Sequence, residues 1–180
     1  MKATTGPRVL LLALGAWLAA WGALAQTINQ GAVMQDVDSL GDAEFVRRAA
    51  MANRFEIEEA QLALALGSDS RLKEFARTMV MDHGAALKDL EAAGRMAGVT
   101  LPDGRFDEAH QAKINAISRK KGADFDRQYR ADQRQAHDDA VALLVAYQRS
   151  GKSEQLRAWA IKALPVVRKH RETIGTLNAP

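Results

Sequence analysis

The chain has 180 residues and no cysteine. The absence of thiols excludes disulfides, thiolate zinc sites, iron–sulfur clusters and covalently attached haem. Small proteins of oxidising compartments often depend on disulfides, so this chain must instead be stabilised by the packing of its core.

The chain also lacks a marked excess of charge of one sign. It has 25 Lys and Arg against 22 Asp and Glu, a formal net charge of +3. Two of these cations, Lys2 and Arg8, lie in the first 25 residues, which contain no acid, so the remainder carries +1 (3 − 2). So small a net charge does not indicate a nucleic acid or another polyanion as a partner.

Long apolar runs are absent after the N-terminus, so we expect no stable membrane span there. The one run, residues 9–21, is shorter than the roughly 20 residues that cross a bilayer. Basic Lys2 and Arg8 precede it, and a small-x-small pattern at residues 23–25 follows it. This order predicts a signal peptide, residues 1–25, cleaved after Ala25, and a periplasmic or secreted protein. An N-terminal membrane anchor is the alternative.

Helical periodicity dominates after a lead-in, residues 26–41, that has no regular pattern. Apolar residues then recur every three or four positions, which predicts four long helices and one short helix. The long helices are expected to begin at capping residues Asp42, Ser68 or Asp69, Asp124 and Ser153, and to end at Gly67, Gly98, Ser150-Gly151 and near Leu177. The short helix is expected over residues 106–121 and to stop at Gly122.

The lengths of the connections predict the topology. Very short links join the first two and the last two long helices, and short links require antiparallel neighbours. Residues 98–123 then form one long crossover that contains the short helix. We therefore expect an all-α fold over residues 42–178, a ferritin-like four-helix bundle of two antiparallel hairpins. An up-down bundle with an extra helix is the alternative.

Four polar side chains fall on the predicted apolar faces. His83, His137 and His170 occupy three different long helices, and Glu56 has the equivalent position on the first. Buried polar groups without partners cost free energy, so such a set needs a reason. Counted from the two short turns, the members of each hairpin differ in height by three or four residues, roughly 5–6 Å along a helix. All four side chains are therefore expected near the middle of the bundle.

Three imidazoles and a carboxylate are suitable ligands for one transition-metal ion, Zn, Cu, Fe, Ni or Mn. Glu56, His83, His137 and His170 are therefore the predicted metal ligands. Asp82, Gln133 and Asp138 are candidates to hydrogen-bond these ligands. A metal-free buried polar network, and partly exposed side chains that do not converge, are the alternatives.

Signatures of enzymatic chemistry are missing. The residues three positions before the inward histidines are Val80, Arg134 and Val167, so the Glu-x-x-His pairs of di-iron bundles are absent. Residues 151–153 resemble the end of a phosphate-binding loop, but Ala146 stands where its first glycine is required. We predict no catalytic residue, and the sequence favours a protein that is not an enzyme.

Several motifs in order resemble those of one family. They are Phe55-Glu56-Ile57-Glu58, Lys73-Glu74-Phe75-Ala76 with Met79-Val80-Met81-Asp82-His83, Gly98-Val99-Thr100-Leu101-Pro102, Phe125-Asp126 with Tyr129 and His137, and Ala163-Leu164-Pro165 with His170. Over roughly residues 42–178 the chain resembles the exported bacterial domain-of-unknown-function 4142 family. The resemblance implies a ferritin-like bundle and export, and it implies no activity.

Two functions remain open from the sequence. The first is a periplasmic bundle that binds or buffers a metal ion through the four inward residues. The second is a metal-free envelope stress or chaperone-like module that binds through an exposed apolar groove or through a kink at Pro165 in the last helix. A protein partner or a homo-oligomer is compatible with either.

Overall fold

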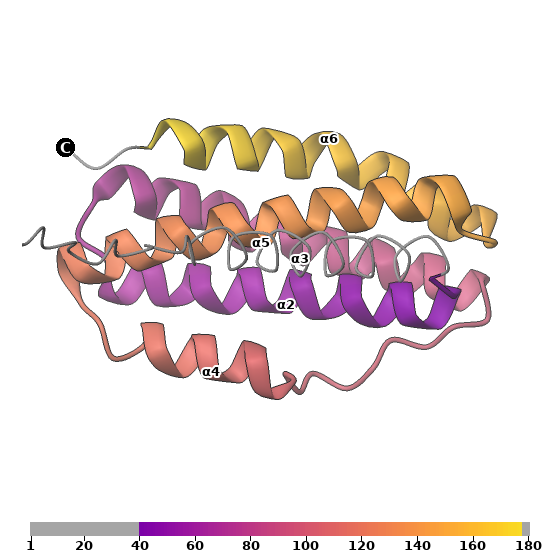
Figure 1. Cartoon of the computed structure of the whole chain (residues 1–180), viewed down its shortest axis with the longest axis horizontal. Helices are drawn as coiled ribbons and strands as arrows, with labels where there is room; N and C mark the ends of the chain where they lie inside the picture. The colour runs from indigo at the N-terminus through magenta and orange to yellow at the C-terminus, as the bar shows by residue number, and fades with distance from the viewer. Residues whose placement is uncertain (1–39, 178–180) are drawn as a thin grey trace, which may run out of the picture. The chain divides into compact units, whose positions relative to one another are not determined.

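A computed structural model describes residues 40–177, and the regular structure in this part is entirely helical (Figure 1). The helices are α2 (Asp42–Leu66), α3 (Ser70–Met96), α4 (Glu108–Ile117), α5 (Gly122–Ser150) and α6 (Glu154–Thr176). The prediction of an all-α fold is confirmed. The predicted signal peptide, residues 1–25, and residues 26–39 of the predicted lead-in lie outside the described residues.

The four long helices pack side by side in a closed ring. Helix α2 contacts α3 and α5, and α6 contacts the same two helices, while short α4 packs on α2 and α5 (Figure 1). The end of α2 lies beside the start of α5, because Ser68 donates to Asp126. The start of α6 lies beside the second half of α3, because the Trp159 indole donates to the Ala86 carbonyl. Neighbours in the ring are therefore antiparallel, in two hairpins joined by one crossover.

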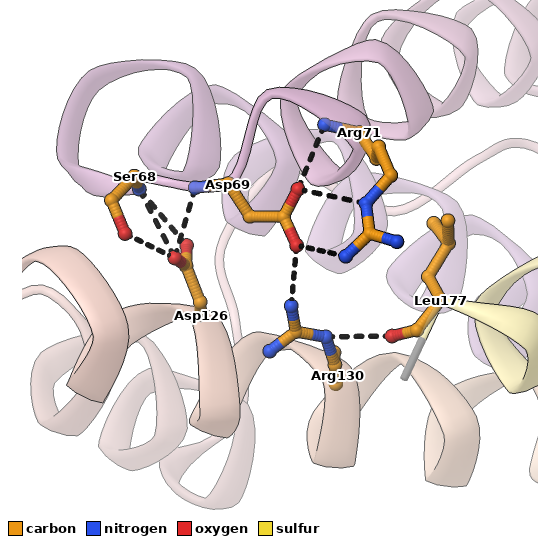
Figure 2. Close-up of polar contacts among 6 residues, drawn as sticks. All are labelled: Ser68, Asp69, Arg71, Asp126, Arg130 and Leu177. Carbon is orange, nitrogen blue, oxygen red and sulfur yellow. Dashed lines mark hydrogen bonds and ion pairs between the residues drawn. The ribbon is translucent and has the colours of Figure 1, made fainter. Parts of the chain in front are cut away.

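A buried carboxylate fastens the α2–α3 turn to α5. Asp126 accepts hydrogen bonds from the backbone N–H groups of Ser68 and Asp69, at 3.1 and 3.0 Å, and from the Ser68 hydroxyl at 2.5 Å (Figure 2). Gly67 allows this approach, since a Cβ there would lie 2.7 Å from the Ala63 carbonyl oxygen and 2.9 Å from Oδ1 of Asp126. The turn between the first two helices is thus positioned by a residue of the third long helix.

An adjacent ion pair connects three helices at the same end of the bundle. The Arg130 guanidinium of α5 donates to the Asp69 carboxylate at 2.7 Å and to the Leu177 carbonyl at 2.7 Å (Figure 2). Both charged side chains are largely buried, so each needs the other as a partner. The start of α3 and the end of α6 are therefore tied to α5.

Several helix boundaries agree with the sequence. Asp69 and Ser153 cap α3 and α6, since their side chains accept the backbone N–H groups of Arg71 and Leu156. Gly98, with φ of 73°, follows the C-cap of α3, and the Val99 N–H bonds back to Gly94 at 2.8 Å. These predicted caps are confirmed.

Three other boundaries differ. Asp42 is the first residue of α2 rather than its cap, because its carboxylate accepts from the Tyr147 hydroxyl. Helix α4 is shorter than residues 106–121, since Asp107 caps it and it ends at Ile117. Helix α5 begins at Gly122, whose φ of 57° turns the chain into the helix, so Asp124 lies in the first turn and is not the cap.

The core of the bundle has two apolar clusters with polar residues between them. One cluster contains Phe45, Leu90, Tyr147, Leu156 and Trp159, and the other contains Leu72, Phe75, Phe125, Tyr129 and Ile174. Buried polar side chains occur on all four long helices at intermediate positions: Asn53, Glu56, Glu59, His83, Gln133, His137 and His170. Within residues 40–177, none of the helices combines the length and apolarity needed to cross a membrane.

Candidate metal centre

Three imidazoles meet in the polar layer between the two apolar clusters. His83 on α3, His137 on α5 and His170 on α6 are exposed by only 7, 0 and 4 %. One ring nitrogen from each lies within 4.8 Å of those of the other two. The ring centroids are 5.4–5.9 Å apart. The structure therefore brings together three of the four predicted ligands.

The tautomer of His83 follows from its partner on α2. Nδ1 of His83 lies 2.9 Å from Oδ1 of Asn53. The amide nitrogen of Asn53 donates to the Ala49 carbonyl at 2.7 Å, which orients its oxygen toward the ring. Nδ1 of His83 therefore carries the proton and donates it. Nε2 keeps a lone pair and has no hydrogen-bond partner in the protein.

The tautomers of His137 and His170 also follow from the acceptor that each ring contacts. Nδ1 of His137 lies 2.7 Å from the Gln133 backbone carbonyl, and Nε2 of His170 lies 2.9 Å from Oδ2 of Asp82. Both partners only accept hydrogen bonds, so these nitrogens are the protonated ones. Nε2 of His137 and Nδ1 of His170 are buried and have no partner in the protein. Each imidazole thus has one nitrogen held by an acceptor and one free.

Burial keeps two of the rings neutral. It holds the pKa of His83 well below its usual value, and the proximity of His137 and His170 lowers it further. Burial likewise lowers the pKa of His137 to about 4, although its hydrogen bond to the Gln133 carbonyl acts in the opposite direction. Neutral imidazole is the form that binds a metal ion.

Glu56 lies beside this group without belonging to it. Its Oε1 is 3.4 Å from Nδ1 of His137, the nitrogen already bonded to Gln133, and its Oε2 has no partner. Burial raises the pKa of Glu56 to about 8. At pH 7 a protonated Glu56 therefore faces a neutral His137, and the contact between them is not an ion pair.

Two further polar residues of this layer were missed from the sequence. Asn53 and Glu59 lie three positions before and after Glu56, on the same face of α2, and this spacing could have revealed them. Glu59 accepts from Nε2 of Gln133 at 3.2 Å, and burial raises its pKa to about 9. Of the three residues proposed as hydrogen-bond partners of the imidazoles, Asp82 accepts from His170 through its carboxylate, and Gln133 accepts from His137 through its backbone carbonyl. Asp138 is not hydrogen-bonded to an imidazole, since it pairs with Arg171 at the exposed surface.

A pocket of about 240 Å³, partly open to solvent, extends from His83 and His170 along α3 and α6. His83, His170 and Glu56 line it together with apolar residues of all four long helices. Where the pocket reaches α3 and α6 near the surface, Lys162 and Asp89 form an ion pair at 2.7 Å. The layer is therefore next to a space that a small molecule can fill.

The fold and this cluster define an all-α protein with three buried, convergent histidines. A family model described as Domain of unknown function (DUF4142) matches residues 27–177, and the chain belongs to this family. The resemblance of the ordered motifs is thereby confirmed. No curated protein and no solved structure matches the chain.

Proposed function

We propose that this protein binds one transition-metal ion through Nε2 of His83, Nε2 of His137 and Nδ1 of His170. The observation that carries the proposal is the set of three free nitrogens, each buried and without a partner. Metal-bound histidines characteristically donate the other ring N–H to a carboxylate, a carbonyl or an amide oxygen. Asp82, the Gln133 carbonyl and Asn53 supply these acceptors.

The spacing of the rings is close to what an ion needs. Bonds of 2.0–2.1 Å in tetrahedral geometry place two nitrogen ligands roughly 3.3 Å apart. One nitrogen of each ring lies within 4.8 Å of one nitrogen of each of the others, so a closure of at most about 1.5 Å reaches this spacing. Imidazole ligands suit Zn, Cu, Fe and Ni, and Mn is less favoured by three nitrogens. Three protein ligands leave at least one coordination position open.

Glu56 compensates the charge of the ion. Neutral imidazoles add no negative charge, so a divalent ion brings two positive charges into a buried layer. The carboxyl of Glu56, in contact with His137, loses its proton when the ion binds and offsets one of them. Its unpartnered Oε2 is also free to take a coordination position, as the sequence predicts for this residue.

The biological setting of the proposal is the bacterial envelope. The signal-peptide pattern of residues 1–25 supports export, and a cysteine-free protein is suited to an oxidising compartment. Two antiparallel hairpins joined by one long crossover support a ferritin-like fold, a class that builds metal sites from facing helices. We therefore assign the protein to metal binding or buffering outside the cytoplasm.

The metal-free alternative makes a different structural demand. A module that needs no ion is expected to satisfy both nitrogens of each buried ring with protein groups, because unpartnered polar atoms cost about 1–3 kcal/mol each. All three rings leave one nitrogen without such a group. This favours the metal proposal.

Titration with Zn²⁺ tests the proposal. Protein purified without a histidine tag and treated with a chelator is expected to bind one ion per chain. The single variants H83A, H137A and H170A are expected to lose this binding, since each removes one ligand. The matched control is H110A, because His110 lies on α4 outside the group and pairs with Asp107. Calorimetry measures the stoichiometry and affinity, and circular dichroism confirms that each variant is folded.

Two results contradict the proposal. One is the absence of Zn²⁺, Cu²⁺ and Ni²⁺ binding by the wild-type protein. The other is an H110A variant that loses as much binding as the three core variants. The variant E56Q tests the role of Glu56 apart from that of the histidines. We expect it to bind one ion per chain with a weaker affinity and without the release of a proton from this side chain.

A further inference from the structure

The pocket beside the imidazoles owes its space to small side chains. Six alanines, one or more from each long helix, line it where larger apolar residues would fill a bundle core: Ala49, Ala52, Ala85, Ala86, Ala140 and Ala163. The other apolar lining comes from Leu143, Leu144, Trp159, Val166 and Val167. The space of about 240 Å³ is partly open to solvent, and most of its lining is apolar.

The pocket is elongated and its two ends differ in polarity. It follows α6 from Trp159 to His170, roughly 16 Å at 1.5 Å per residue. Its polar end is lined by two of the imidazoles that have a free nitrogen and by three other polar residues: His83, His170, Asn53, Glu56 and Asp82. Trp159 and Leu144 lie at the other end, within the apolar cluster. The pocket therefore suits a long apolar body with one polar head group.

We infer that this pocket binds a medium-chain fatty acid, with the carboxyl group at His83 and His170 and the alkyl chain toward Trp159. The volume sets the length of the chain. An apolar cavity of about 150 Å³ holds benzene, which has six carbons, so about 240 Å³ has room for nine or ten carbons at the same filling. The lining follows α6 from Trp159 to His170, and this length favours a linear chain over a ring.

The head group has a partner with or without the metal ion. In the metal-free protein the carboxylate takes up one proton from solution on binding, and the resulting carboxylic acid donates a hydrogen bond to a free imidazole nitrogen, such as Nε2 of His83. In the metal-loaded protein the carboxylate takes the open coordination position. Only this second contact rests on the proposed metal binding, since the apolar pocket itself is independent of the ion.

Access to the pocket is possible between α3 and α6. Lys162 and Asp89 line the pocket there and pair at 2.7 Å, with their side chains 76 and 50 % exposed. Ion pairs this exposed contribute little free energy and open readily. Val166, 42 % exposed, completes this part of the lining. A ligand can therefore enter without unfolding a helix.

A series of linear carboxylates tests the inference by calorimetry, in chelator-treated and in Zn²⁺-loaded protein. From butanoate to octanoate, each added CH₂ is expected to strengthen binding roughly three- to fourfold, the value for burying one methylene. The gain is expected to stop near ten carbons, so tetradecanoate binds no more tightly than decanoate. Equal affinities for butanoate and octanoate in both forms of the protein overturn the inference.

Two alanine variants of α6 provide a matched pair. A163F fills the pocket, while A158F places the same side chain on the exposed side of the same helix. We expect A163F to weaken octanoate binding at least tenfold and A158F to bind as the wild type does. An A163F variant that is folded and binds octanoate as the wild type does contradicts the inference. If A163F does not fold, the chain-length series on the wild-type protein tests the inference by itself.

The two proposals fail in different ways. If no metal binds, the octanoate series in the chelator-treated protein still tests the pocket. If the protein binds Zn²⁺ but binds short and long carboxylates with equal affinity, the metal proposal is retained and the fatty-acid proposal is refuted.

Discussion

At the residue scale, each inward imidazole is oriented by one hydrogen bond. The acceptors are chemically different: an amide oxygen for His83, a backbone carbonyl for His137 and a carboxylate for His170. An acceptor on one nitrogen places the proton there and leaves the lone pair on the other. Each ring thus keeps one buried nitrogen that no protein group engages.

The carboxylate partner of His170 provides the first prediction. The change D82N removes a charged acceptor from Nε2 of His170, so the ring is less well oriented and less basic. We expect Zn²⁺ affinity to fall about tenfold, the low end of such effects, because Asp82 is partly exposed. The control is D89N on the same helix, which is expected to keep the wild-type affinity. Competition with a chromogenic chelator measures both, and equal affinities of D82N and wild type would refute this role.

Glu59 provides the second prediction. Burial raises its pKa to about 9, against an ordinary value of 4.5, so the native state holds a proton that the unfolded chain releases. The free energy of unfolding therefore falls as the pH rises from about 4.5 toward 9. E59Q keeps the shape and removes this loss. Relative to wild type, we expect E59Q to gain up to about 1.4 kcal/mol per pH unit across this range.

Urea unfolding at pH 5, 6.5 and 8 measures this difference. The control is E58Q, the same change at the neighbouring glutamate, which is partly exposed. A constant difference between E59Q and wild type at the three pH values would contradict a raised pKa for Glu59.

At the element scale, the ends of the helices are set by contacts of two kinds. Local caps such as Asp69 and Ser153 act within a few residues and are visible in the sequence. Asp42 is also of a residue type that favours the N-cap position, but its carboxylate accepts a hydrogen bond from the distant Tyr147 hydroxyl instead. Cap patterns therefore predict a helix end only where no distant residue competes for the same side chain.

The α2–α3 turn provides the third prediction. G67A adds a Cβ that would lie 2.7 Å from the Ala63 carbonyl oxygen and 2.9 Å from Asp126, so the turn must shift. We expect it to lower the free energy of unfolding by about 1–3 kcal/mol. The control is G84A within α3, where a Cβ meets nothing within 4 Å and an alanine raises stability by about 0.5–1 kcal/mol. Thermal unfolding distinguishes the two, and equal shifts would contradict the steric argument.

At the scale of the whole molecule, a polar layer interrupts the core between two apolar clusters. The apolar clusters at the ends hold the four helices together, assisted by Arg130 at one end and Asp42 at the other. The middle is therefore free to contain groups that reduce stability, such as Glu56 and Glu59. The proposed site lies in this polar layer between the two apolar clusters.

Export provides the fourth prediction, which concerns the whole chain. Expression of the full chain in a bacterial host is expected to yield a periplasmic protein that begins at Gln26, because the pattern before it is that of a cleaved signal peptide. Intact mass spectrometry of the periplasmic fraction measures this. L12R places a charge in the apolar run and is expected to retain the protein in the cytoplasm. A wild-type protein that keeps residues 1–25 would refute cleavage.

The all-α class, the family and most helix ends can be predicted from the amino-acid sequence alone. Helical periodicity, caps and turn lengths depend on neighbours within a few residues, so a single chain displays them. The packing of the four helices was needed to show that Glu56 stands beside the histidine group, that Asn53 orients His83, and that six alanines line a pocket. These features depend on the rotation of each helix and on rotamers across the bundle, which spacing along one helix does not specify.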